Sequence, residues 1–182
     1  WVLKLDSDGE VVWLKKEYGG SAVVPVADGG FVIMGTKNDA PGIFKLDSDG
    51  NEQWYQPMAQ WYQATDAVDQ ADLIASGEGA YAGVINRNDL STRTYENLLV
   101  MLSDRDTGAD IDWFRVFSRA DYYDAIDYRA LLPAPGGGYW AAGTTGADLI
   151  CILRVDSDGN ALSVSPRLIG GGLERHSVQD AA

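Results

Sequence analysis

Cysteine and histidine each occur once in the 182 residues, as Cys151 and His176. A single cysteine excludes an intrachain disulfide. Because Cys151 lies in the apolar run 149–153, we expect it to be a buried, inert thiol. The lone histidine leaves no assignable Ser-His-Asp or Cys-His set, and no glycine-rich phosphate loop follows a strand and opens a helix. The sequence therefore offers no catalytic motif of these kinds.

Basic residues are scarce, because 14 Lys and Arg stand against 27 Asp and Glu, for a net charge of −13. Phosphate binding needs clustered Lys and Arg, so the composition argues against a nucleic-acid partner. The acidic excess has two explanations, a solvated surface in a salty or extracellular setting or cation-binding loops, and the first is the default. Apolar runs are also short. None is long enough to cross a bilayer, so we expect no transmembrane segment.

The sequence contains instead a repeated hexapeptide. Residues 4–9 and 45–50 read KLDSDG, and residues 154–159 read RVDSDG. A tryptophan follows the first two at the same distance, as Trp13 and Trp54. Self-similarity of this kind indicates a repeat architecture.

Around the hexapeptides, short apolar runs alternate with clusters of Gly, Asp and Asn, which is typical of strands joined by hairpins. Four runs make up each unit, and no segment has a sustained helical period with caps, so helix content should be very low. Glycines flank the second run of each unit and suggest close backbone approach. The residues expected near the packed inner part are Val32, Ile33, Tyr81, Trp140 and Ala141.

Four-stranded units of this length are typical of β-propeller blades. The sequence therefore predicts an all-β chain of four-stranded antiparallel blades, with about three and a half blades visible. The units are a half blade at 1–20, blades at 21–60, 61–120 and 121–170, and the start of a further blade at 171–182. Propellers typically need four to eight blades. We therefore expect a part of a larger propeller, completed by the same chain or a partner chain.

The Lys-Leu-Asp strand end, the Asp-Gly turn and the downstream tryptophan resemble the blades of secreted bacterial and archaeal β-propeller repeat proteins. The turn at 104–108, followed by Trp113, is similar to the tryptophan-docking repeat of PQQ-like quinoprotein propellers, with one extra residue before the Trp. Ser163 stands at the tryptophan position of the last unit. The resemblance implies an exported or cell-surface protein and does not specify a ligand.

The tryptophans have a physical role independent of this resemblance. A large ring on the fourth strand can wedge between adjacent blades and bury apolar area at each seam. We therefore expect Trp13, Trp54 and Trp113 to be structural rather than ligand-stacking residues.

The Asp-Ser-Asp-Gly turns have two interpretations. Asp47, Asp49 and Asn51 alternate as calcium ligands might, but the distant bidentate Glu of an EF-hand loop is missing. The alternative is a tight turn, in which Asp side chains accept from nearby backbone N–H groups and Gly takes a positive φ. We favour the turn and expect no cofactor, with calcium as the weaker alternative.

Two polar or aromatic regions are candidates for partner binding. Residues 86–97 read as an insertion between the second and third strands of one blade, and insertions on one face of a repeat fold often bind ligands. Aromatic and acidic runs at 61–66 and 121–124 should lie on one rim, where Tyr and Trp could contact a sugar or a protein, although packing between blades is the default. The candidate residues are Trp61, Tyr62, Tyr122, Tyr123, Arg87, Arg93 and Tyr95.

Two functions remain open. The first is a non-enzymatic extracellular or cell-surface module that binds or scaffolds a protein or glycan partner. The second is an enzyme of the quinoprotein or glycan-processing type, with its site in the central channel of the propeller. An enzyme would require converging polar side chains, and usually a cofactor or metal, at the channel mouth.

Overall fold

The computed structural model describes residues 1–58, 67–77, 79–89, 94–105, 108–119, 126–145 and 150–162. Within these ranges the chain forms β-strands and no helix, which confirms the all-β prediction. It follows that no helix there is long and apolar enough to cross a membrane.

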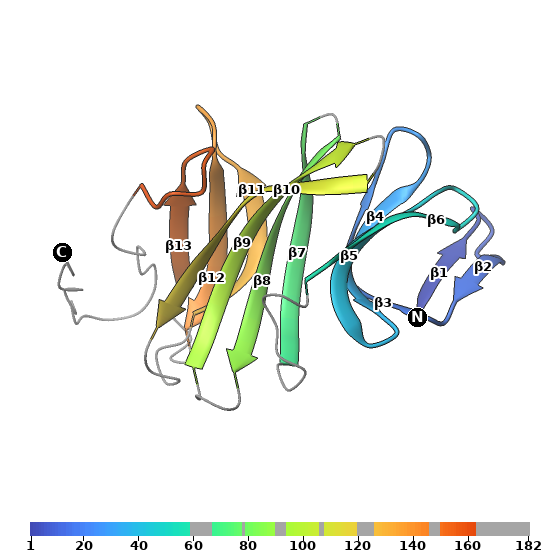
Figure 1. The fold of residues 1–182 in the computed structure, drawn as a ribbon, viewed down its shortest axis with the longest axis horizontal. Helices are drawn as coiled ribbons and strands as arrows, with labels where there is room; N and C mark the ends of the chain where they lie inside the picture. Colours follow the sequence, from blue (N-terminus) through green and yellow to red (C-terminus); the bar gives the residue numbers. More distant parts are fainter. Residues whose placement is uncertain are drawn as a thin grey trace.

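Four antiparallel sheets follow one another along the long axis of the molecule, in the order of the chain (Figure 1). We number them I to IV. Sheet I consists of β1 (Val2–Leu5) and β2 (Val11–Lys15), and sheet II of β3 (Tyr18–Pro25), β4 (Phe31–Lys37), β5 (Ala40–Leu46) and β6 (Glu52–Pro57). Sheet III consists of β7 (Ala67–Gly77), β8 (Ala80–Asp89), β9 (Thr94–Arg105) and β10 (Gly108–Arg119), and sheet IV of β11 (Ile126–Pro133), β12 (Tyr139–Thr145) and β13 (Ile150–Val155).

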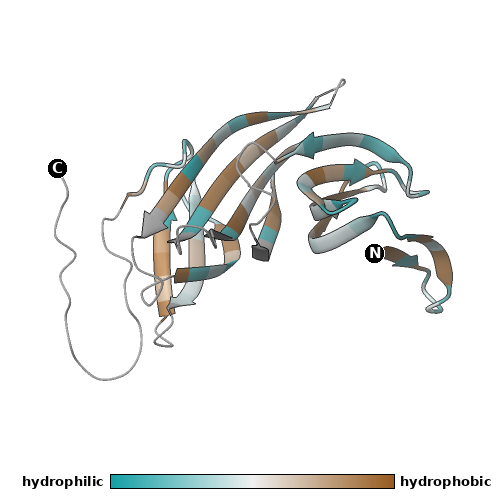
Figure 2. Cartoon of the chain, turned by 60° about the horizontal axis from the view of Figure 1, so that its bottom comes forward, coloured by the Kyte–Doolittle hydropathy of each residue, from teal (hydrophilic) through white to brown (hydrophobic). Residues whose placement is uncertain are grey.

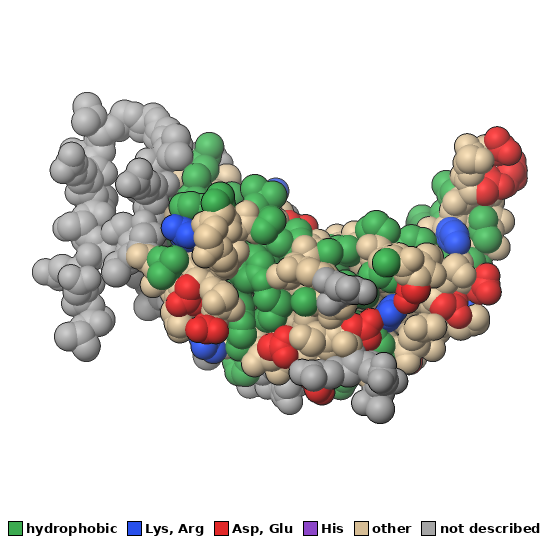
Figure 3. All heavy atoms as spheres, turned by 90° about the horizontal axis from the view of Figure 1, so that it is seen from above, with side chains coloured by type: hydrophobic (Ala, Val, Ile, Leu, Met, Phe, Trp, Pro, Cys, Tyr) green, Lys and Arg blue, Asp and Glu red, His purple; other side chains and the backbone are tan. Residues whose placement is uncertain are grey.

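Within each sheet, every strand pairs with its neighbour in the sequence, and the stack of sheets curves into a crescent (Figure 3). We call the face that a sheet turns toward the next sheet its forward face, and the opposite face its rear face. Successive side chains of a strand point to opposite faces. In β4, for example, Val32 and Met34 lie on the forward face, and Ile33 on the rear face. Hydrophobic bands therefore cross the middle strands (Figure 2).

Three hydrophobic clusters fill the spaces between consecutive sheets. Between sheets I and II, the rear-face residues Ile33, Phe44 and Leu46 pack with Tyr18 and are joined by Val2 and Trp13. Between sheets II and III lie Val24, Val32, Met34, Ile43, Trp54, Met58, Leu73, Tyr81, Ile85, Leu98, Val100 and Leu102. Between sheets III and IV lie Ala82, Val84, Leu99, Ile126, Tyr128, Leu131, Tyr139, Ala141, Cys151, Leu153 and Val155.

The predicted inner residues are buried with one exception. Val32, Ile33, Tyr81 and Ala141 are at most 3% exposed. Trp140 is only half-buried, with the Arg154 guanidinium 5.3 Å from its ring centroid. Its strand position matches the expectation, but Trp140 lies on the forward face of sheet IV, against which no further described sheet packs.

The two ends of the stretch 86–97 are strand rather than insertion loop, which corrects the sequence-based interpretation of these residues. Residues 86–89 continue β8 and residues 94–97 begin β9, and the two segments pair in register. The polar residues were misjudged because strand pairing satisfies the backbone of a polar segment as well as that of an apolar one.

Candidate functional site

A repeated contact joins consecutive sheets: the indole N–H of a tryptophan on one sheet donates a hydrogen bond to the next sheet. We call this contact the tryptophan dock. Trp13 of sheet I donates its Nε1–H to the Ser48 carbonyl, which lies in the turn between β5 and β6 of sheet II, at 3.1 Å. Lys4, the strand partner of Trp13, donates its Nζ to the same oxygen at 2.7 Å. One backbone carbonyl thus accepts both an indole and a cation from the preceding sheet.

The other two seams repeat the contact with variations. Trp54 of sheet II donates to Asp104 Oδ1 at 2.9 Å, and its strand partner Lys45 donates to Asp104 Oδ2 at 2.7 Å. Trp113 of sheet III donates to the Ser157 carbonyl at 2.8 Å, but its strand partner is Met101, so this seam has the indole without the cation. The predicted position of Trp13, Trp54 and Trp113 at the seams between consecutive units is confirmed by these contacts.

Glycine in the receiving turn makes room for the indole. Gly50 and Gly159 both have φ of +80°, and a Cβ at these positions would lie 2.9 Å and 2.5 Å from ring atoms of Trp13 and Trp113. Glycine at this position therefore has two roles. It adopts the left-handed conformation of the turn, and it leaves space for the indole ring that lies against it.

The seam between sheets II and III also holds a partly buried ion pair. Lys45 Nζ lies 2.7 Å from Asp104 Oδ2 and 2.8 Å from Asp28 Oδ2, and the Lys45 side chain is 10% exposed. Burial by itself would lower the Lys45 pKa, but the hydrogen bonds and charges of Asp104 and Asp28 outweigh it and raise the pKa above its usual value. The hydrogen bond from Lys45 lowers the pKa of Asp28.

The calcium candidates Asp47, Asp49 and Asn51 form a hydrogen-bonded turn. Asp47 Oδ1 accepts from the backbone N–H groups of Asp49 and Asn51, both within 2.9 Å, and its Oδ2 accepts from the Asn51 amide at 3.1 Å. These bonds lower the pKa of Asp47, chiefly through the Asn51 backbone N–H. The predicted turn chemistry is confirmed. In the described ranges no three His, Cys, Asp or Glu residues are grouped so that they could hold a metal.

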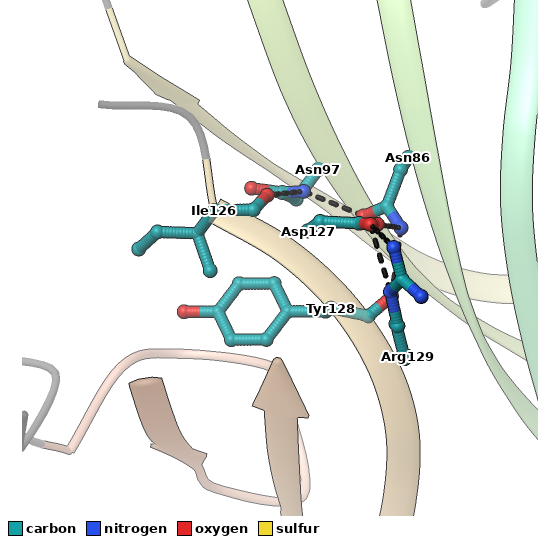
Figure 4. Close-up of polar contacts among 6 residues, drawn as sticks. All are labelled: Asn86, Asn97, Ile126, Asp127, Tyr128 and Arg129. Atoms are coloured by element: carbon teal, nitrogen blue, oxygen red, sulfur yellow. Dashed lines mark hydrogen bonds and ion pairs between the residues drawn. The ribbon is translucent and has the colours of Figure 1, made fainter. Parts of the chain in front are cut away.

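A buried polar cluster forms a second link between sheets III and IV (Figure 4). Asn86 of β8, fully buried, donates its Nδ2 to Asp127 Oδ1 at 2.6 Å and to the Tyr128 carbonyl at 2.7 Å. Asn97, the strand partner of Asn86, donates to Asn86 Oδ1 at 2.6 Å and to the Ile126 carbonyl at 2.8 Å. The two amides thereby pair with the start of β11.

Arg129 closes this cluster toward the solvent. Its Nε and Nη2 both donate to Asp127 Oδ2, at 2.9 and 2.6 Å, and its side chain is 57% exposed. The buried amides and the Asp127 carboxylate hydrogen-bond to one another. The cluster is therefore suited to holding sheets III and IV together rather than to acid–base chemistry. Sequence reasoning missed it, although Asn86 and Asn97 bound the stretch that it had singled out.

Most of the predicted binding residues lie outside the described part of the chain. Trp61, Tyr62, Arg93, Tyr122 and Tyr123 are not among the described residues.

Arg87 and Tyr95 belong to β8 and β9, where they pair with Glu96 and Asn88, and the description of both residues ends at the backbone. Arg87 directly follows Asn86 of the buried polar cluster on β8, and Tyr95 lies two residues before Asn97 on β9.

A cavity of about 460 Å³ lies between β1 and β3. Its lining is mainly apolar and includes Trp1, Leu3, Leu5, Val23 and Phe31. Leu5 and Val23 are 48% and 59% exposed, so the cavity is open to solvent along an incompletely covered apolar surface.

No protein-family model matches the chain, and no curated protein is similar enough in sequence to count as a match.

Proposed function

We propose that the chain is a stretch of β-propeller blades that serves as a non-enzymatic binding or scaffolding module at the cell surface, with a protein or glycan partner. The observation that carries the proposal is the repeated seam. Three successive tryptophan docks link four antiparallel sheets, and stacked units of one kind are how repeat folds build extended binding surfaces.

The way in which the polar side chains are used favours a scaffold over an enzyme. The Lys45 ion pair and the Asn86 cluster each link one sheet to the next. An enzyme would need such groups to converge on a substrate instead. The high negative charge is consistent with a solvated surface outside the cell.

The partner-binding residues proposed are those of the aromatic and acidic runs at 61–66 and 121–124, together with Arg87, Arg93 and Tyr95. Aromatic rings beside carboxylates and arginines are suited to stacking on sugars or anchoring a protein surface.

Binding can be tested with a glycan array and with intact cells of the source organism, probed with the purified chain. The variants are Trp61→Ala with Tyr62→Ala, Tyr122→Ala with Tyr123→Ala, and Arg87→Ala with Arg93→Ala and Tyr95→Ala. At least one of the three should lose about tenfold or more in affinity, as expected of interface anchors. Trp1→Ala, which removes an aromatic ring that is 73% exposed, is the matched control and should bind normally.

Absence of binding to glycans and cells would contradict the proposal. Reduction of an electron acceptor by the chain loaded with PQQ, or release of sugar from a glycan, would instead support a propeller enzyme of the quinoprotein or glycan-processing type. Protease treatment of intact cells should degrade the protein if it lies at the cell surface, and protection from protease would contradict that location.

A further inference from the structure

In the seam between sheets III and IV, a methionine stands where the other two seams have a lysine. Lys4 and Lys45 are the strand partners of the docking tryptophans of sheets I and II, and both donate to the next sheet. Met101 is the strand partner of Trp113. A thioether has no proton to donate and is only a weak acceptor, so Met101 contributes to its seam chiefly by packing.

The Met101 sulfur is part of the contact between the two sheets, which lie side by side (Figure 1). The Tyr139 hydroxyl of sheet IV donates to Met101 Sδ at 3.7 Å, and it also hydrogen-bonds with the Ser76 hydroxyl of sheet III. Met101, Trp113 and Tyr139 all belong to the hydrophobic cluster between the sheets, and the two ring centroids are 6.4 Å apart. A change at the sulfur therefore acts directly on this seam.

Met101 is more accessible to solvent than the other sulfur-containing side chains. The chain has three methionines and one cysteine. Met34 and Met58 are each 2% exposed, and Cys151 is fully buried, whereas Met101 is only partly buried. Oxidation of a thioether requires contact with the oxidant, and a fully buried side chain meets solvent only when the structure opens locally. An oxidant in solution should therefore reach Met101 first.

We propose that Met101 is an oxidation site for hydrogen peroxide and that its sulfoxide weakens the seam between sheets III and IV. A lone pair of the sulfur attacks one peroxide oxygen and the O–O bond breaks. The proton of the transferred hydroxyl passes to the departing oxygen, which leaves as water. The sulfur is oxidised by two electrons and the peroxide is reduced by two, so the reaction consumes one peroxide for each sulfoxide.

The sulfoxide weakens the seam because it places a polar group among apolar side chains. The new oxygen projects from the sulfur atom that receives the Tyr139 hydroxyl, so that contact has to rearrange. Burying a polar group in apolar surroundings costs free energy unless its hydrogen bonds are replaced. The oxygen also adds volume beside Trp113, and an extra atom in a packed interior is destabilising.

Peroxide should affect this seam and leave the other two intact. The docks of sheets I and II carry Lys4 and Lys45, which have no sulfur to oxidise. Met34 and Met58 lie in the cluster between sheets II and III, where burial protects them. Met101 thus makes one link of the stack sensitive to peroxide. The inference does not rest on the binding function proposed above.

Peptide mass spectrometry of the chain during peroxide treatment tests the site. Met101 should gain an oxygen atom about tenfold or more faster than Met34 and Met58. The oxidised chain should melt about 2–4 °C below the untreated chain. Hydrogen exchange should become faster in β9 and β12, which carry Met101 and Tyr139, and stay unchanged in β2 and β5. Equal oxidation rates at the three methionines, or a Met101 sulfoxide that changes neither melting nor exchange, would overturn the proposal.

Two variants distinguish Met101 from damage elsewhere. Met101→Leu has no sulfur at this position, so peroxide should not change its melting temperature, whereas the matched control Met34→Leu should lose as much as the parent chain. Methionine sulfoxide reductases should restore the melting temperature of the oxidised parent chain. A treated Met101→Leu chain that loses as much as the parent, or an oxidised parent that the reductases do not restore, would contradict the proposal. Met101→Lys, with the residue type of the other docks, replaces Met101→Leu if circular dichroism shows that the latter is unfolded.

Discussion

Sheets I and II contain the same hexapeptide but differ in their surroundings. In both, an aspartate caps the turn and a glycine with positive φ completes it. In sheet II the turn receives Trp13 and Lys4, and Leu46 is fully buried. In sheet I the corresponding turn receives no described group, and Leu5 is 48% exposed.

The difference separates local from tertiary effects. The hexapeptide forms the turn by hydrogen bonds within five residues, so its conformation is the same in both sheets. Whether the same leucine and glycine contribute to the core depends on a neighbouring sheet, which the hexapeptide does not specify. Substitutions at the filled docks should therefore affect stability more than matching substitutions at the empty dock of sheet I.

Removing the ring from a filled dock should have the largest effect. Trp54 is 8% exposed and donates to Asp104, so Trp54→Ala should lower the free energy of unfolding by about 3–5 kcal/mol. Urea denaturation measures this loss. Trp1→Ala removes a ring that is 73% exposed and should leave the unfolding midpoint unchanged. A Trp54→Ala midpoint equal to that of the parent chain would show that the ring does not support the seam.

Removing the cation of a filled dock should have the next largest effect. Lys45→Met leaves Asp104, whose side chain is 17% exposed, without its cation in the seam, and should cost about 3 kcal/mol in urea denaturation. Lys4→Met removes a hydrogen bond to a neutral carbonyl and should cost only about 1–2 kcal/mol. Equal losses for the two variants would contradict the ion pair as the source of the difference.

A side chain placed in the dock distinguishes the filled turn from the empty one directly. Asparagine tolerates positive φ, so Gly50→Asn and Gly9→Asn strain the backbone to a similar extent. Only Gly50→Asn places a Cβ against an indole, and it should cost about 1–3 kcal/mol more than Gly9→Asn. Urea denaturation of the two variants measures the difference, and similar midpoints would mean that the Trp13 ring moves aside freely.

The ion pair of the filled dock should make the Lys45→Met penalty depend on pH. The pKa of Asp28 is lowered, so its contribution is present above its ordinary value of 3.8 and is lost as pH falls through the lower folded value. The Lys45 pKa is raised, so its contribution is present below 10.5 and is lost as pH rises through the higher folded value. Unfolding free energies of both chains, measured across pH, should therefore differ most between these limits. A difference independent of pH would exclude the charges as its origin.

Calcium should produce the smallest effect and should not distinguish the two turns. Asp47 and Asp6 both hold backbone N–H groups through Oδ1, so the hydrogen-bonded turns do not require a cation. Melting temperatures with calcium should match those with magnesium at equal ionic strength. A saturable stabilisation by calcium alone would establish Asp47, Asp49 and Asn51 as ligands.

Local signals in the sequence predicted much of this structure. The alternation of apolar runs with Gly, Asp and Asn placed the strands, and KLDSDG placed the turns, because both depend on neighbouring residues. The tryptophan four residues after the turn glycine was correctly assigned to the seams, since a ring of that size is most often buried between packed elements.

The tertiary structure alone decided the contacts between sheets. Asn86 and Asn97 appeared as ends of a polar insertion, and only the paired strands β8 and β9 bring their amides together against Asp127. Asp104 likewise became the acceptor for Trp54 and Lys45 because sheet III stacks on sheet II. The sequence by itself determined strands and turns, whose interactions span a few residues. Which sheet covers which face, and hence which polar group is buried and paired, was decided by packing between segments some forty to sixty residues apart.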